Sequence, residues 1–255
     1  MSAASPPPPP PAADPAPDQI YADPRLAACY DTFDGERDDL DHYEAMIDEL
    51  GARTIVDVGC GTGSLAVRLA ARGLTVTGVD PAAASLDMAR SKPHAEAVTW
   101  IHGTAPDLPP LGADLAVMTG NVAQVFLTDE SWLRTLRGIR AALRPGGWFV
   151  AESRRPERRA WEEWQADTDP QVHEVPGVGR VRSRARSVEV ALPLVTFTDD
   201  FRFEDGTTRS STSTLRFREE AELRASLAEA GLEVREIREA PDRPGREYVL
   251  VARAV

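Results

Sequence analysis

A run of alternating glycines after a short apolar segment constrains the fold of this 255-residue chain more than any other feature. Residues 54–58 are rich in β-branched side chains, which favours a strand buried on both faces. Gly59, Gly61 and Gly63 follow, and residues 64–72 have the leucine spacing of a helix. Glycine permits positive φ and close approach of a ligand to the main chain, and a helix amino terminus offers free N–H groups. The run therefore predicts a nucleotide-type binding turn between a strand and a helix.

The spacing around this turn separates two kinds of nucleotide ligand. A second apolar run ends at Asp80, where dinucleotide folds have an acidic residue that binds the ribose hydroxyls. A dinucleotide fingerprint also needs glycine at the sixth position of G-x-G-x-x-G, and this chain has Ser64 there. The observed pattern is D-x-G-x-G-x-G, beginning at Asp57. The spacing therefore disfavours a nicotinamide-dependent oxidoreductase.

This pattern resembles motif I of the class I S-adenosylmethionine-dependent methyltransferases. The resemblance implies that the methionine end of S-adenosyl-L-methionine binds at the glycine turn and that Asp57 is part of the same cofactor site. It also implies that Asp80, followed by Pro81, binds the ribose of this cofactor. The family members that the chain resembles are enzymes that act on small molecules.

The resemblance extends well beyond the glycine turn. The string LRPGGWFVAES at residues 143–153 resembles the helix end, Pro-Gly-Gly turn and fifth strand of the same family. Apolar stretches at 232–237 and 248–252 resemble its terminal hairpin. The implied fold is α/β, with a three-layer, Rossmann-like, seven-stranded sheet that ends in an antiparallel hairpin. An antiparallel β insertion is expected after the fifth strand.

The chain is expected to divide into a tail, a core and an insertion. Residues 1–18 include six consecutive prolines and cannot bury enough apolar surface to fold, so a disordered tail is expected. The methyltransferase core is assigned to residues 19–153 and 215–255. Residues 154–214 form strand-like stretches, two of them joined by an Asp-Gly turn signal, and are expected to cover the acceptor site.

The amino-terminal part of the core has the apolar spacing of helices. This spacing runs over residues 20–50, where Gly51 ends it. In related methyltransferases a comparable segment lies over the cofactor and often contains a tyrosine. The resemblance therefore implies that Tyr30 is a lid residue that contacts the cofactor. The alternative is that Tyr30 and Phe33 are core contacts of an amino-terminal helix.

The ends of the third and fourth predicted strands supply further cofactor candidates. Many relatives have an aspartate that binds adenine where this chain has Thr104, so Thr104 and the neighbouring Ala105 are assigned this contact. A capping or turn role for the Thr104 hydroxyl is the alternative. Thr119 and Asn121 follow the fourth strand. Because ligands bind beyond the carboxyl ends of parallel strands, we expect all of these residues at one edge.

The acceptor is expected to contact residues from two regions of the chain. Asn121 and Gln124 lie where related enzymes face the reactive methyl group, and Trp161 and His173 belong to the insertion. An amide has no useful pKa, so neither Asn121 nor Gln124 is a general base. No catalytic base is assigned, and no cluster of acidic residues has convincing metal-ligand spacing.

Four arginines alternate along one predicted strand of the insertion. They are Arg180, Arg182, Arg184 and Arg186, and the period of two places them on one face. One interpretation is a surface that binds an anionic acceptor. The other is a solvated strand face paired with acidic neighbours, or an edge protected by charge.

Bulk composition restricts the partners of the chain. The net charge of −12 argues against nucleic acid and anionic membranes, since phosphate binding needs a basic surface. The longest apolar run is too short to span a membrane, and no signal peptide is expected, so a cytoplasmic protein is the default. A homodimer formed through the insertion is a possibility that the sequence leaves open.

The sequence thus predicts an S-adenosylmethionine-dependent methyltransferase that transfers a methyl group to nitrogen or oxygen of a small-molecule acceptor. Two alternatives remain. One is a non-catalytic protein of the same fold that binds the cofactor. The other, disfavoured by Ser64 and the terminal hairpin, is a nicotinamide-dependent oxidoreductase.

Overall fold

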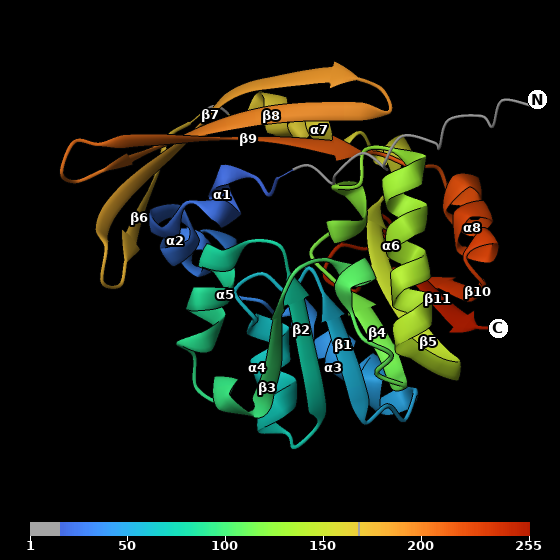
Figure 1. Cartoon of the computed structure of the whole chain (residues 1–255). Coiled ribbons are helices and arrows are strands. Elements are labelled where there is room, and N and C mark those ends of the chain that lie inside the picture. The colour runs from blue at the N-terminus through green and yellow to red at the C-terminus, as the bar shows by residue number, and fades with distance from the viewer. Residues whose placement is uncertain (1–15, 168) are drawn as a thin grey trace, which may run out of the picture.

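The computed structural model describes residues 16–167 and 169–255, so most of the predicted disordered tail lies outside the described residues. A seven-stranded sheet forms the centre of the molecule (Figure 1). Its strands are β1 (Thr54–Val58), β2 (Thr75–Asp80), β3 (Val98–His102), β4 (Ala113–Met118), β5 (Leu143–Arg154), β10 (Leu232–Arg238) and β11 (Glu247–Ala254). Their order is β10-β11-β5-β4-β1-β2-β3. Neighbours from β5 to β3 are parallel, whereas β11 is antiparallel to both β5 and β10.

Helices cover both faces of this sheet and make three layers. The longer ones are α3 (Asp39–Glu49), α4 (Ser64–Ala71), α5 (Ala83–Arg90), α6 (Asp129–Ala142) and α8 (Glu220–Glu229). Short 3₁₀ helices are η1 (Ala95–Ala97), η2 (Ala105–Asp107), η3 (Val122–Gln124) and η4 (Pro156–Arg158). Alternation along the strands divides the core, because Ile55 packs with α3 and α4 while Val56 packs with α6 and α8. The predicted three-layer, Rossmann-like sheet with a terminal hairpin is confirmed.

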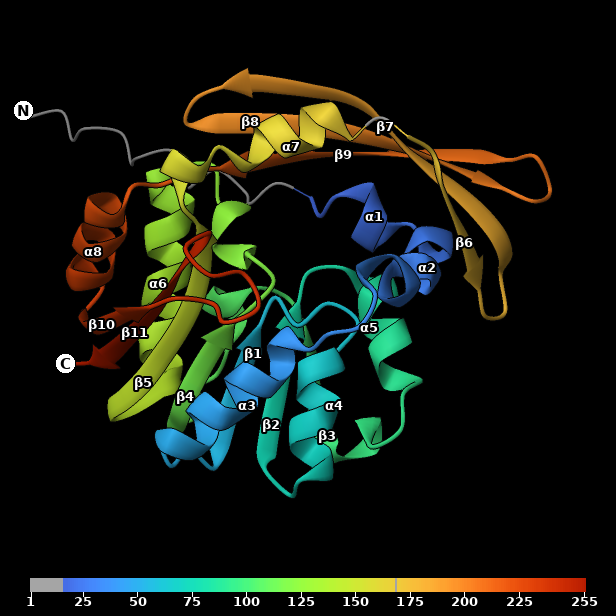
Figure 2. The same ribbon diagram turned by 180° about the vertical axis from the view of Figure 1, so that it is seen from behind.

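A second, antiparallel sheet follows β5. Its strands, in spatial order, are β6 (Gln171–Val175), β7 (Gly179–Ala191), β8 (Leu194–Phe203) and β9 (Thr208–Arg216), and helix α7 (Ala160–Ala166) precedes them. The sheet lies across the carboxyl-end edge of the large sheet (Figures 1 and 2). The predicted antiparallel insertion is therefore confirmed, while the domain boundaries at 154 and 214 stay a prediction.

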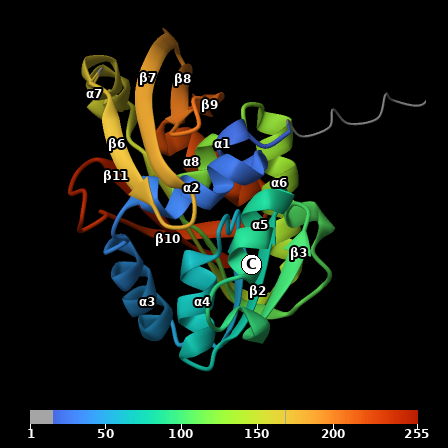
Figure 3. The same cartoon turned by 90° about the vertical axis from the view of Figure 1, so that its left-hand side faces the viewer.

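Two amino-terminal helices lie between the second sheet and the core. They are α1 (Gln19–Ala22) and α2 (Pro24–Asp34), and Figure 3 shows them between the second sheet and α5. Leu26 and Cys29 of α2 pack against Val181 and Phe201 of the second sheet. The apolar face of α2 thus attaches the insertion to the amino-terminal segment.

Several local elements differ from the sequence prediction. The helical spacing over 20–50 is divided into α1, α2 and α3, because Asp23 caps α2 and Gly35 adopts φ 74° at its end. The Pro-Gly-Gly turn was expected to lie between a helix and a strand, but residues 145–147 are part of β5, which starts at Leu143. Strand β6 was not predicted, because most of its side chains are exposed and the apolar alternation is weak.

No helix within the two described stretches is both long and apolar enough to cross a membrane.

Candidate functional site

The glycine turn after β1 has one position open to a ligand. Gly59, Gly61 and Gly63 have φ values of 72°, 52° and 76°, all in the left-handed region that favours glycine. A Cβ on Gly59 would lie 2.6 Å from Val122, and one on Gly63 would lie 2.5 Å from Trp100. A Cβ on Gly61 would meet nothing within 4 Å. Packing therefore requires glycine at the first and third positions, and the second leaves free space beside the main chain.

Asp80 lies next to this free space at the carboxyl end of β2. Its carboxylate accepts hydrogen bonds from the backbone N–H groups of Gly61 and Ala82, each at 2.8 Å. Burial raises the pKa of Asp80, and the two N–H donors oppose this effect. A carboxylate has about four acceptor positions, so two remain available for hydroxyl groups of a ligand.

Asp57 lies in β1, two residues before the first glycine of the turn, and its contact with the cofactor stays a prediction. Its side chain is 2% exposed. Burial, together with the charge of Asp80, raises the pKa of Asp57 to about 7, and Arg37 opposes this shift. Two buried carboxyl groups therefore lie close together beneath the turn.

Helix α2 is attached to the glycine turn by polar contacts. The ammonium group of Lys92, the only lysine in the chain, lies 2.6 Å from a carboxylate oxygen of Asp31 in α2. Lys92 also donates a hydrogen bond to the hydroxyl of Ser64 at 3.0 Å, and Thr62 donates one to Asp31. These contacts place α2 over the turn, as the lid interpretation of the amino-terminal segment expects.

The ends of β3 and β4 contain the remaining cofactor candidates. Thr104 is the N-cap residue of η2, and its N–H and hydroxyl groups both donate to Asp107, at 2.8 and 2.9 Å. Ala105 is buried under α6, where it contacts Gly138. The capping alternative for Thr104 is thus present in the structure, and its contact with adenine stays a prediction. The same holds for Pro81, whose carbonyl oxygen faces His102, and for Thr119 after β4.

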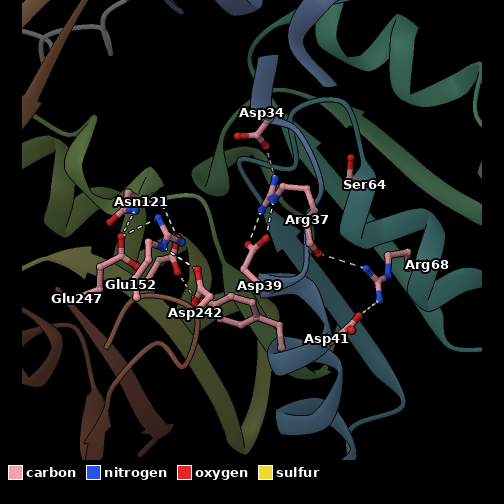
Figure 4. A network of polar contacts seen from close by, with 12 residues as sticks. Asp34, Arg37, Asp39, Asp41, Ser64, Arg68, Asn121, Glu152, Asp242 and Glu247 are labelled. Carbon is pink, nitrogen blue, oxygen red and sulfur yellow. Dashed lines mark hydrogen bonds and ion pairs between the residues drawn. The ribbon is translucent and has the colours of Figure 1, made fainter. Parts of the chain in front are cut away.

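Asn121 is held between two buried glutamates (Figure 4). Its backbone N–H donates to Glu152 at 2.9 Å, and its side-chain amide donates to Glu247 at 2.8 Å. Tyr43 donates to Glu152, and Arg243 forms an ion pair of 3.0 Å with Glu247. The side-chain oxygen of Asn121 is buried without a hydrogen-bond partner among the described residues. Asn121 therefore has one free acceptor at the carboxyl edge of the sheet.

This network affects the pKa of Glu152. Glu152 and Glu247 are each 1% exposed. Burial and then the charge of Glu247 raise the pKa of Glu152, while the Tyr43 hydroxyl, Arg243 and the Asn121 N–H oppose the shift. Figure 4 shows a second network nearby, in which Arg37 lies between Asp34 and Asp39 and fixes the loop from α2 to α3.

A pocket of about 440 Å³ lies between α1–α2 and the inner face of the second sheet. This volume is within the range of small-molecule sites. Its aromatic lining consists of Tyr21, Tyr30, Phe33, Phe197 and Phe201. Its polar lining includes Asp34, His173 and Asp199. The structure thus brings together Tyr30 and His173, which were assigned to the cofactor and the acceptor respectively.

The other three acceptor candidates lie elsewhere, Asn121 between its two glutamates and the remaining two in the packed interior. Trp161 is 3% exposed and packs edge-on against Phe217, with ring centroids 4.8 Å apart. Gln124 is fully buried and accepts a hydrogen bond from Arg154 at 3.0 Å. Neither lines the 440 Å³ pocket, and their contact with an acceptor stays a prediction.

The sequence did not single out three carboxylates that the structure places at this edge of the molecule. Glu152 lies two residues before the carboxyl end of β5, close to the edge where Asp80 ends β2, so a similar strand-end argument applies to it. Glu247 reaches the edge only because β11 runs antiparallel to β5. Asp199 lies on the inner face of the insertion, where the pairing of β7, β8 and β9 determines its position.

The alternating arginines of β7 lie on the exposed face of the strand, and Arg184 also contributes to the lining of the pocket. All four are exposed, whereas Val181, Ser183 and Ala185 between them are at least partly buried. Arg180 pairs with Glu174 at 2.7 Å, and Arg186 lies 3.9 Å from Asp200. These contacts match the interpretation of a solvated face paired with acidic neighbours.

The strand order, the antiparallel last strand and the glycine turn beside a strand-end carboxylate together define a class I methyltransferase fold. Residues 55–147 match the family described as a methyltransferase domain. The matched segment belongs to this family, and the class predicted from the sequence is confirmed.

Individual relatives agree with this assignment. The cypemycin N-terminal methyltransferase of a Streptomyces species is 36% identical over 99 residues, which cover 38% of this chain and 40% of the relative. The CcbJ methyltransferase of Streptomyces caelestis has a TM-score of 0.70 at 23% identity, covering 90% of this chain and 96% of that chain. CalS10, an amino pentose methyltransferase of Micromonospora echinaspora, has a TM-score of 0.69 at 22% identity, covering 89% and 95%.

The matches to the curated relatives cover only part of each protein. The chain spans between 20% and 54% of the length of the first curated relatives it matches. At identities below one quarter, the similarity to the solved structures establishes the fold.

Proposed function

We propose that this chain is an S-adenosylmethionine-dependent methyltransferase that acts on nitrogen or oxygen of a small-molecule acceptor. The observation that carries the proposal is the open space at Gly61 beside the Asp80 carboxylate. The structure of CalS10 is described as bound to S-adenosylmethionine, which supports the choice of cofactor. The names of CalS10 and of the cypemycin enzyme, which indicate an amino sugar and an amino terminus, favour nitrogen as the acceptor atom.

The residues of the site fit this cofactor. Asp80 retains two acceptor positions for ribose hydroxyls, and Gly61 leaves space for a ligand against the main chain. The amino terminus of α4 starts at Ser64, directly after the turn, and favours a carboxylate. When bound, the cofactor supplies a methyl group on a positively charged sulfur, which is already a good leaving group.

The chain itself contributes orientation and exclusion of water. Helix α2, held by Lys92, covers the glycine turn and limits access of water from that side. Asn121 has a free, buried oxygen at the same edge, outside the lining of the 440 Å³ pocket, and a ligand group that reaches this edge can donate to it. Orientation alone can supply much of the rate of an in-line displacement.

The acceptor is assigned to the 440 Å³ pocket. Tyr21 connects this pocket with the cofactor edge, because it lines the pocket while its carbonyl oxygen accepts a hydrogen bond from Ser85 of α5. The charge of Asp80 is also close enough to contribute to the raised pKa of Tyr21, which burial mainly causes. The volume suits a metabolite, whereas a folded protein or a duplex would be far too large.

Turnover tests the proposal directly. The wild-type protein is incubated with S-adenosylmethionine and a mixture of amine and hydroxyl metabolites, and S-adenosylhomocysteine and methylated products are measured by mass spectrometry. We expect products with the wild type and with Asp87→Ala, whose carboxylate is exposed on α5, and far less with Asp80→Ala. Cofactor binding without any product across chemically diverse acceptors would instead support the non-catalytic alternative.

A further inference from the structure

One half-buried carboxylate of the pocket has no partner among the described residues. Asp199 is half-buried on β8 and lines the pocket from the inner face of the second sheet. Across the described parts of the chain, no hydrogen bond or ion pair reaches its side chain. The other carboxylate of the inner wall, Asp34, is neutralised by Arg37 at 2.7 Å. Leaving a half-buried charge unpaired is costly, so Asp199 is suited to a charge that arrives with a ligand.

The charged residues that line the pocket are mostly acidic. Asp167 and Asp169 lie exposed at the rim, and Arg184 is the cation that also lines the pocket. Arg184 lies on β7, whose alternation directs its side chain to the outer face. Four of the lining residues are aspartates, against one arginine and one histidine, which favours a cationic ligand over an anionic one.

Aromatic rings line the same pocket as this carboxylate. Phe33 and Phe201 stack with centroids 5.2 Å apart, and Tyr21 and Tyr30 lie at the same distance from each other. Phe197 adds a further ring from the same strand as Asp199. Ring faces attract ammonium groups, particularly when water is partly excluded. A hard metal ion, in contrast, needs several oxygen ligands, and among the described lining residues of β7, β8 and β9 Asp199 is the one carboxylate.

We propose that the pocket binds an organic cation, an ammonium group or protonated amine, with Asp199 as its counter-ion and the aromatic rings as its walls. That this cation belongs to the methyl acceptor rests on the proposed function. The cation site itself requires only the pocket. The inference thus narrows the acceptor to molecules that carry at least one basic nitrogen.

A pair of isosteric probes tests the role of charge. Choline carries a trimethylammonium group, and 3,3-dimethylbutan-1-ol has the same shape without the charge. Binding of each is measured by NMR titration of the protein without cofactor, at pH 8 and low salt. Burial and the neighbouring Asp200 raise the pKa of Asp199 to about 6, so its carboxylate is ionised under these conditions.

We expect choline to bind at least about tenfold more tightly than the neutral alcohol. Asp199→Asn should remove this preference. Asp200→Asn is the matched control, because Asp200 follows on the same strand but faces outward, where it accepts a hydrogen bond from Ser210 at 2.6 Å. Equal binding of the two probes, no binding of choline to the wild type, or an unchanged preference in Asp199→Asn would overturn the proposal. Thermal unfolding of each variant shows whether it is folded.

The two proposals fail in different ways. If choline shows no preferred binding, the cation proposal is wrong, but the wild type should still bind S-adenosylmethionine, since Asp80 and Gly61 lie outside the pocket lining. If the cofactor does not bind while choline does, the proposed function is wrong and the cation site stands.

Discussion

Lys92 and Asp31 form an ion pair, with 2.6 Å between Nζ and Oδ2, that joins the segment after α5 to helix α2 across the glycine turn. The Lys92 side chain is 20% exposed and also donates to Ser64, the first residue of α4. Three segments that are distant in sequence therefore meet at one ammonium group. Helix α2 also carries Tyr30 into the pocket lining, so this contact connects the glycine turn with the 440 Å³ pocket.

Lys92→Met is expected to loosen α2. Removing a partly buried ion pair of this kind costs about 1 kcal/mol, which corresponds to about a fivefold weaker affinity for S-adenosylmethionine. Amide hydrogen exchange in residues 24–34 should also become faster. Arg90→Met is the matched control, because Arg90 pairs only with the exposed Asp87 on α5. Unchanged exchange in α2 would show that Lys92 does not hold the helix.

Gly61→Ala is expected to block the cofactor while the fold persists. The new methyl group would enter the free space beside the turn, so the affinity for S-adenosylmethionine should fall by at least about tenfold. The positive φ of 52° also costs about 1 kcal/mol of folding free energy. Gly51→Ala controls for this strain, since Gly51 has φ 65° and open surroundings at the end of α3. Equal cofactor affinity in both variants would contradict the assigned position of the ligand.

The buried Asp57 predicts a dependence of stability on pH. Its pKa is about 7 in the folded protein and about 3.8 when unfolded, so the folded state binds the proton more tightly. Protonation of Asp57 therefore adds up to about 4 kcal/mol to the free energy of unfolding. This stabilisation is complete below pH 3.8 and is lost as the pH rises through 7. Urea unfolding should therefore show wild-type stability falling relative to Asp57→Asn between pH 5 and 8. A constant difference between the two proteins would disprove the shift.

The sequence was informative wherever a short segment determines its own structure. The strand at 54–58 and the helix after Gly63 lie where predicted, because β-branched residues, glycines and leucine spacing act locally. Asp80 was found by its distance from the turn, and the structure places its carboxylate on Gly61.

Local sequence patterns do not predict features that depend on pairing between distant segments. Strand β6 has few apolar residues, and only its register with β7 makes it part of a sheet. Asp199 faces the pocket because Ala185 and Ser211 flank it on neighbouring strands. Asn121 lies between Glu152 and Glu247 because β4, β5 and β11 meet at one edge. Such relationships follow from topology, which no local pattern encodes.

The central claim is that the turn and Asp80 hold S-adenosylmethionine. Isothermal titration calorimetry of S-adenosylmethionine into the wild type and into Asp80→Ala measures this most directly. We predict one binding site per chain for the wild type and an affinity at least about tenfold lower for Asp80→Ala, because ribose hydroxyls lose their acceptor. Folded wild-type protein that shows no binding at millimolar cofactor, or an Asp80→Ala variant with unchanged affinity, would contradict the claim.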